Sequence, residues 1–160
     1  MRSGRRKKRG FTYLAVLILV ALMGGGLAVY GEMASHARQR EKEAELIWIG
    51  NQFREAIGLY YQRTPGAAKR FPETLEDLLE DRRFLTHQRY LRRIYADPFT
   101  GKSEWGLIQA PGGGIAGVYS LAEGRSIGNL VLGRNPDVLP SGATYQEWKF
   151  MYEPPIHPSR

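Results

Sequence analysis

The sequence predicts an α+β protein in which a long N-terminal helix packs on a small antiparallel sheet. Three observations carry this prediction: an uncharged apolar run over residues 11–31, a proline-free segment with a helical apolar stripe over residues 32–62, and short β-prone segments separated by glycine and proline turns in the last third of the chain. Apolar spacings of three and four residues are typical of helix, whereas alternation is typical of strands.

The first ten residues form a basic leader, with six Arg or Lys side chains. Phe11–Tyr30 follows, a run of 20 residues that as a helix is long enough to cross a hydrocarbon core of about 30 Å. The basic flank predicts a cytoplasmic N-terminus, with the rest of the chain beyond the membrane. Ala28 and Gly31 supply only a weak small-x-small cleavage site. Two interpretations stay open: a signal anchor that is kept, or a leader removed at the inner face.

The junction Lys8-Arg9-Gly10-Phe11-Thr12, followed by the apolar run, resembles the class III signal of type IV pilins and type II secretion pseudopilins. The resemblance implies that a prepilin peptidase cleaves between Gly10 and Phe11 and methylates the new amine of Phe11. It also implies partners: other pseudopilins or pilins, and an inner-membrane assembly platform.

One position departs from that family. Its members normally carry glutamate at the fifth mature position, where this chain has Ala15. A carboxylate inside a membrane is costly unless it is paired, and in the family its partner is thought to be the N-terminal amine of a neighbouring subunit. Ala15 removes that attraction and leaves the helix intact, which argues against a major, repeating subunit and leaves the cleavage prediction untouched.

Three consecutive glycines, Gly24, Gly25 and Gly26, interrupt the expected transmembrane stem 11–31. Each costs about 1 kcal/mol relative to alanine inside a helix. The run predicts either close helix packing in the bilayer or a segment that extends when the subunit leaves the membrane, and both can hold.

Residues 32–62 continue the stem as an amphipathic helix. The face expected to pack on the domain core carries apolar residues at helical spacing, widened by two more: Leu46, Ile49, Phe53, Ile57 and Tyr60, with Trp48 and Ala56. The opposite face is expected to be solvated: Arg40, Glu41, Lys42, Glu43, Glu45 and Arg54.

The globular α+β part is expected over residues 63–153. A short helix is predicted after Pro72, with Leu75, Leu78 and Leu79 on its apolar face. With Phe71, these residues resemble the aromatic-Pro-x-x-Leu-x-x-Leu segment that follows the stem in the type II secretion major pseudopilin. Asp97-Pro98 and Thr100-Gly101 predict two tight turns, and Asp97 is taken as a turn residue rather than a catalytic acid.

Strands are predicted in the rest of this part. Residues 103–109 and 115–121 should pair as a hairpin around the glycines 112–114, and Tyr145, Trp148, Phe150 and Tyr152 suggest a last strand. Residues 124–143 should form a surface loop, and residues 154–160 a flexible tail.

Charge and composition exclude several function classes. The net charge of +7 belongs to the leader: removing its six cations leaves 17 basic residues against 16 acidic ones, which argues against nucleic-acid binding. The chain has no cysteine, hence no disulfide or thiol nucleophile. His36, His87 and His157 lack metal-ligand spacing, Asp137 stands alone where a calcium loop would need several acids, and the arginines Arg82, Arg83, Arg92 and Arg93 suit a solvated face. We therefore expect no enzyme, no metal and no cofactor.

The sequence as a whole predicts a structural subunit of a type II secretion pseudopilus, anchored in a bacterial inner membrane with its C-terminal domain in the periplasm. Three alternatives stay open: a minor type IV pilus subunit, a periplasmic binding module that keeps its signal anchor, and a DNA-uptake pilin, which would need a basic outer domain.

Overall fold

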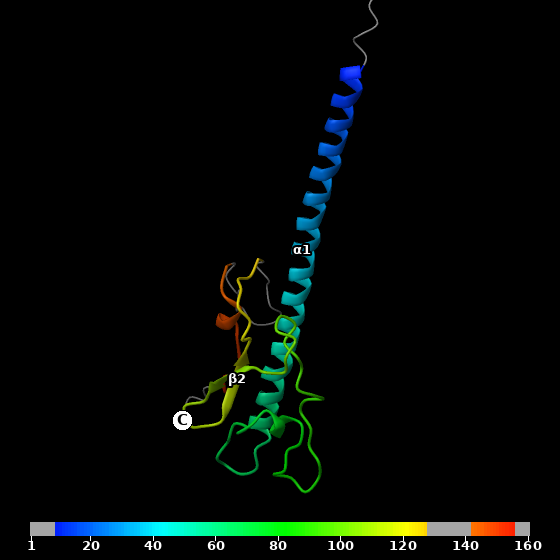
Figure 1. Cartoon of the computed structure of the whole chain (residues 1–160). Coiled ribbons are helices and arrows are strands. Elements are labelled where there is room, and N and C mark those ends of the chain that lie inside the picture. The colour runs from blue at the N-terminus through cyan, green and yellow to red at the C-terminus, as the bar shows by residue number, and fades with distance from the viewer. Residues whose placement is uncertain (1–8, 128–141, 156–160) are drawn as a thin grey trace, which may run out of the picture. The chain divides into compact units, whose positions relative to one another are not determined.

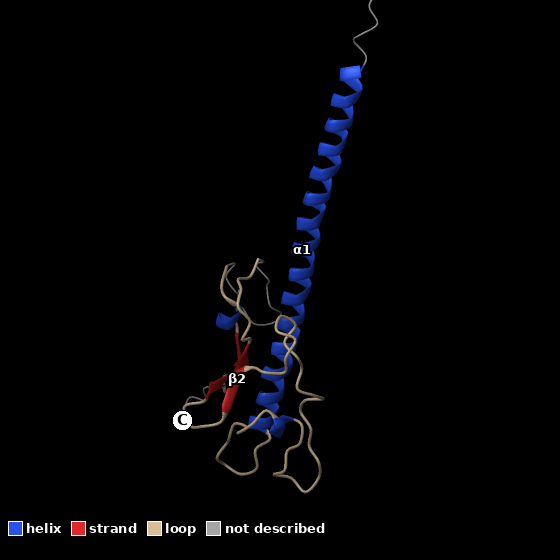
Figure 2. Cartoon of the chain, in the orientation of Figure 1, coloured by secondary structure: helices blue, strands red, loops and turns tan. Residues whose placement is uncertain are grey.

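The structure, a computed structural model, describes residues 9–127 and 142–155, with the side chains of residues 9–11 and 22–34 left out. The helix α1 spans Arg9–Gln62, and the chain divides into two compact units, Met1–Gln39 and Arg40–Arg160. The second unit holds a small antiparallel sheet and two single-turn 3-10 helices (Figures 1 and 2). The predicted α+β class with a small antiparallel sheet is confirmed.

The sheet has three strands in the order β1-β2-β3: β1 spans Gly106–Gln109, β2 spans Ile115–Tyr119 and β3 spans Lys149–Met151. Both pairings are antiparallel, and the register places Leu107 opposite Val118 and Val118 opposite Phe150. The predicted hairpin is confirmed. Its turn needs glycine, since Gly113 and Gly114 have φ of 89° and 81°, a region that costs L-residues with a side chain.

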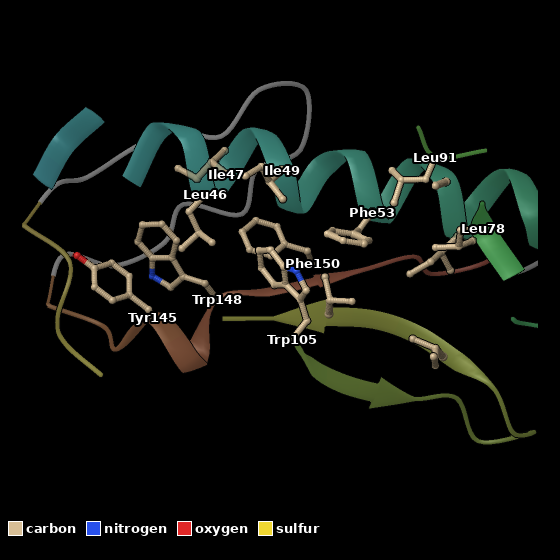
Figure 3. Close-up of a cluster of buried hydrophobic side chains, with 14 of the residues drawn as sticks. Leu46, Ile47, Ile49, Phe53, Leu78, Leu91, Trp105, Tyr145, Trp148 and Phe150 are labelled. Carbon is tan, nitrogen blue, oxygen red and sulfur yellow. The ribbon is translucent and has the colours of Figure 1, made fainter. Parts of the chain in front are cut away.

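The core lies between the C-terminal part of α1 and the sheet. The five stripe residues Leu46, Ile49, Phe53, Ile57 and Tyr60 are each no more than 7% exposed, as the helical spacing predicted. Figure 3 shows helix side chains such as Leu46 and Phe53 directed toward Trp148, Phe150 and Trp105. Burying each large apolar side chain contributes roughly 1.5–3 kcal/mol, so this face holds the helix to the sheet.

Two glycines let α1 approach β3 closely. A Cβ atom at Gly50 would overlap the ring of Phe150, and one at Gly58 would lie 2.7 Å from Cδ2 of Tyr152. Phe150 and Tyr152 are two residues apart and so share one face of the chain, while the two glycines lie about two helical turns apart. The rings of β3 and the residue after it therefore fit into notches on the helix.

Two predictions about the helix faces were wrong. Trp48, expected on the buried face, is 52% exposed, and Glu43, expected in solvent, is fully buried. The buried arc is turned from the expected one: Ile47, at 8% exposure, and the glycine notches lie inside it. Apolar spacing found the centre of this arc but not its edge, where two members are glycine and one is charged.

The helix predicted after Pro72 is only one 3-10 turn, η1, over Glu76–Leu78. The Asp77 carboxylate accepts hydrogen bonds from the backbone N–H groups of Glu73 and Thr74, both at 3.0 Å. The carbonyl of Leu78 accepts from the N–H groups of Tyr90 and Leu91, so a later loop takes the acceptor that a longer helix would use. Leu78 is buried, and Leu75 and Leu79 pack partly buried against the core.

The last predicted strand is also shorter than expected. Tyr145 lies in a second 3-10 helix, η2 (Tyr145–Glu147), which is closed by a capping box between Thr144 and Glu147. Only Lys149–Met151 pairs with the sheet. Of the expected loop 124–143 and tail 154–160, residues 128–141 and 156–160 lie outside the described residues.

Candidate functional site

The predicted cleavage junction lies in the first turn of α1, which begins at Arg9 and contains Gly10 and Phe11. The side chains at this junction are outside the described part of the chain. Gly24, Gly25 and Gly26 also lie in α1, and their surroundings are likewise outside it. The predicted roles of these five residues remain predictions.

Residues 12–21 are the described part of the expected stem, and all of their side chains are exposed, Ala15 included. Seven large apolar side chains among them are between 47% and 69% exposed: Tyr13, Leu14, Val16, Leu17, Ile18, Leu19 and Val20. They cover every side of the helix, a pattern typical of a segment surrounded by other apolar material. Continuous exposure of this kind to water is costly.

Among the residues whose side chains are described, no helix is both long enough and apolar enough to cross a membrane. The expected span Phe11–Tyr30 extends beyond those residues.

Asp97 is a structural turn residue, as predicted from Asp-Pro. Its side chain is fully buried. One carboxylate oxygen, Oδ1, accepts from the N–H groups of Phe99 and Thr100 at 2.8 and 3.4 Å, and Oδ2 accepts from the hydroxyl of Ser120 at 2.5 Å. Oδ1 thus closes the turn itself, and Oδ2 ties the turn to the residue that follows β2.

The C-terminal end of α1 is closed by an arginine from a later loop. The guanidinium of Arg83 lies 3.5 Å from the ring centroid of Tyr60 and donates to the Tyr60 carbonyl at 3.1 Å and to the Thr64 hydroxyl at 2.8 Å. It also donates to both oxygens of Asp81, at 2.8 and 2.6 Å. The last carbonyls of a helix lack intrahelical donors, and Arg83 supplies one.

This cluster perturbs the protonation of its members. Burial of the Asp81 carboxyl by itself raises its pKa, but hydrogen bonds from Arg83 and Tyr90 outweigh burial and hold the pKa below its ordinary value. Burial also raises the pKa of Tyr90, and the hydrogen bond to Asp81 raises it further. The ion pair is therefore present at neutral pH and acts as a structural clamp.

Glu43 is the functional-looking side chain that sequence reasoning missed. Its Oε1 accepts from the backbone N–H of Ile127 at 3.0 Å and from the hydroxyl of Tyr145 at 2.9 Å. Its Oε2 is buried and has no hydrogen-bond partner in the described structure, as is also true of Nε1 of Trp148. The carboxylate thus ties the helix to two segments distant in sequence. Only the tertiary fold reveals this, because Glu43 sits in a run of charged residues.

The other candidate chemical groups do not converge. Arg82, Arg92 and Arg93 are exposed while Arg83 is half-buried, so Arg83 does not belong to the solvated face expected for all four arginines. His36 and His87 are exposed and far apart in sequence, and His157 and Asp137 lie outside the described residues. Within the described ranges, no three His, Asp or Glu side chains are grouped to hold a metal ion.

Comparison with known proteins adds no relative: no family model, no curated protein and no solved structure matches this chain.

Proposed function

We propose that this chain is a structural subunit of a type II secretion pseudopilus, processed by a prepilin peptidase between Gly10 and Phe11 and assembled from the bacterial inner membrane. The observation that carries the proposal is the junction itself. A basic leader ends at Gly10-Phe11, and directly behind it lies a helix whose described stem side chains are all exposed and almost all apolar.

The exposed stem supports an anchoring and assembly role. A helix that is apolar on every side is stable in lipid or among other apolar helices. In the proposed cycle the stem 11–31 waits in the membrane and then packs against the stems of neighbouring subunits. With Ala15 at the fifth mature position, this packing proceeds without an intramembrane carboxylate, so orientation has to come from the outer domain.

The outer domain supports the same role. The C-terminal part of α1 supplies one face of the core, and a small antiparallel sheet covers it, an arrangement that is pilin-like. The polar clusters around Asp97 and Arg83 serve turns and a helix end, so in this proposal the chain catalyses nothing. Its partners are the peptidase, other pseudopilins and the assembly platform, and its domain lies in the periplasm.

The proposal is tested by measuring the intact mass and the N-terminal sequence of the full-length protein extracted from membranes of cells with and without a prepilin peptidase. We expect a chain that begins at N-methylated Phe11 only where the peptidase is present. A Gly10→Leu variant is the matched control, because it alters the cleaved bond and leaves the stem intact; it should keep residues 1–10 in both strains.

A chain that keeps its leader in both strains would reject the proposal and favour the signal-anchored periplasmic module. A cleaved chain would be compatible with the pseudopilus subunit and also with a minor type IV pilus subunit, the second candidate, which Ala15 favours. Deleting the secretion machinery and, separately, the pilus machinery distinguishes the two, since the subunit should be lost from assembled fibres only when its own machine is absent.

A further inference from the structure

The exposed face of α1 in the outer domain combines an aromatic ring with carboxylates. Trp48 is 52% exposed, and its ring stands edge-on to Tyr95 at a centroid distance of 5.4 Å. Glu41 lies seven residues before Trp48, Glu45 three residues before it and Glu55 seven residues after it. These spacings place all three carboxylates on the face of the helix that carries Trp48, and all three are exposed. The three ion pairs of the described residues involve none of them. We call these four residues the Trp48 face.

A loop of the same domain carries the opposite combination. Leu85 is fully exposed, and Arg82, His87 and Arg89 around it are exposed as well. Glu80 is the exposed acid next to these residues, and its carboxylate oxygens lie 3.7 Å from Nη2 of Arg82 and 3.1 Å from Nδ1 of His87. Arg89 pairs with no carboxylate there, since its Nε donates to the Leu91 carbonyl. We call Arg82, Leu85, His87 and Arg89 the Leu85 tip.

Both surfaces are held in place before any partner binds. The base of the Leu85 tip is closed by a backbone hydrogen bond of 2.9 Å from Asp81 to Gln88 and by the stacking of Arg83 on Tyr60. The Trp48 ring is oriented by Tyr95, which itself carries the guanidinium of Arg93 at 5.2 Å from its centroid. Prior ordering lowers the entropic cost of binding, and tryptophan and arginine are the side chains most often found at binding hot spots.

Trp48 and the anchor of the Leu85 tip lie at different heights along α1. Arg83 anchors the tip beside Tyr60, twelve residues after Trp48 along α1, which is about 18 Å of helix. We propose that the Leu85 tip of one copy docks on the Trp48 face of a second copy, with Leu85 against the indole ring and the arginines against the carboxylates. This inference rests on the proposed function. It requires neighbouring copies of the chain, which Ala15 alone argues against, and it assigns to the outer domain the orientation that the missing glutamate would otherwise provide.

The symmetry of such a contact has a consequence. The two surfaces differ, so each copy offers one half to the neighbour before it and the other half to the neighbour after it. Heterologous contacts of this kind generate open chains unless a ring closes. A protein that uses this contact therefore forms a series of multimers rather than a dimer.

Cysteine crosslinking of the full-length chain tests the proposal, since the natural sequence has no cysteine. The double variant Trp48→Cys with Leu85→Cys is expressed in membranes of cells that have the peptidase, oxidised, and run without reductant. A disulfide needs Cα atoms roughly 4.4–6.8 Å apart, and a link within one chain would leave a monomer, so a ladder reports contacts between copies. We expect a ladder of multimers, and only a dimer when the two single variants are expressed together.

Two control variants define the site. Leu121→Cys in place of Trp48→Cys offers a position of similar exposure, 42%, outside both surfaces, and should give no ladder with Leu85→Cys. Glu45→Cys, combined with Leu85→Cys, keeps the Trp48 ring and should give a ladder. Added to the Trp48/Leu85 pair, Glu45→Arg should cause loss of the ladder, and Arg89→Glu should restore it in that background.

The results separate this contact from the proposed function. An equal ladder with Leu121→Cys, a dimer from Trp48→Cys alone, or no ladder from both the Trp48/Leu85 and the Glu45/Leu85 pairs would each overturn the head-to-tail contact. The same samples give the N-terminal mass: a chain that starts at Phe11 but forms no ladder leaves the pseudopilin proposal standing, and an unprocessed chain refutes that proposal whatever the gel shows.

Discussion

Alanine in place of Gly50 should destabilise the outer domain, even though alanine is the better helix former. The new Cβ would overlap the ring of Phe150, which is only 3% exposed and packed on all sides. Overpacking a well-filled core costs about 1–3 kcal/mol, while exchanging glycine for alanine in a helix returns about 1 kcal/mol. We expect a net loss of up to about 2 kcal/mol in the free energy of unfolding.

Urea unfolding of the full-length protein in detergent, followed by tryptophan fluorescence, measures this loss. The three tryptophans Trp48, Trp105 and Trp148 all lie in the Arg40–Arg160 unit, so the signal reports on the outer domain. Gly112→Ala is the control, because a Cβ there has open space around it, and it should be close to neutral.

The double variant Gly50→Ala with Phe150→Leu tests the mechanism. If the clash with the ring is the cause, Phe150→Leu should be less harmful in the Gly50→Ala background than alone, which gives a coupling energy of opposite sign to the single losses. A Gly50→Ala protein that is more stable than the natural one, by the amount helix propensity alone supplies, would refute the close approach of β3 to the helix.

Three further predictions use the same unfolding assay. Asp81→Asn should lower the free energy of unfolding at pH 7 by about 1–3 kcal/mol. The pKa of Asp81 in the folded protein lies below its ordinary value of about 4, so the ionised carboxylate stabilises the fold above about pH 4. The difference in stability between the two proteins should therefore shrink as the pH falls below about 4. An unchanged difference at low pH would contradict this assignment. Asp97→Ala should cost about 2–4 kcal/mol, since it removes the acceptor of the buried Ser120 hydroxyl and of two N–H groups, and a neutral result would show that the turn does not need the carboxylate. Glu43→Ala should cost about 1–3 kcal/mol through loss of the acceptor for the Ile127 N–H, whereas Glu43→Gln, which keeps an oxygen there, should lose less; equal losses would argue against that bond.

The structure of the outer domain could be predicted where local pattern and tertiary environment agree. The stripe from Leu46 to Tyr60 is buried because residues at helical spacing share one side, whatever covers them. The hairpin of β1 and β2 follows from two β-prone segments around glycines that can adopt positive φ. The same holds for Asp97, whose side chain forms local hydrogen bonds within the turn that Asp-Pro predicts.

Side chains whose role depends on distant partners could not be predicted. Glu43 is buried because Ile127 and Tyr145, more than eighty residues later, supply its donors, and Trp48 is exposed because the sheet covers the neighbouring arc of the helix. Gly50 and Gly58 appear as helix-weakening residues until the rings of Phe150 and Tyr152 are placed on them. Arg83 appears as one of four surface arginines until the fold brings it to the end of α1.

The sequence by itself determined the α+β class, the buried stripe from Leu46 to Tyr60 and the hairpin, because these follow from the period of apolar residues and from the positive φ that glycine can adopt. Only the tertiary structure decided how far the buried arc of α1 extends beyond that stripe, where β3 begins, and which charged groups are clamps rather than surface. Those outcomes depend on groups that meet across the fold, and a polar or small side chain carries no local signal of the partner that it will find.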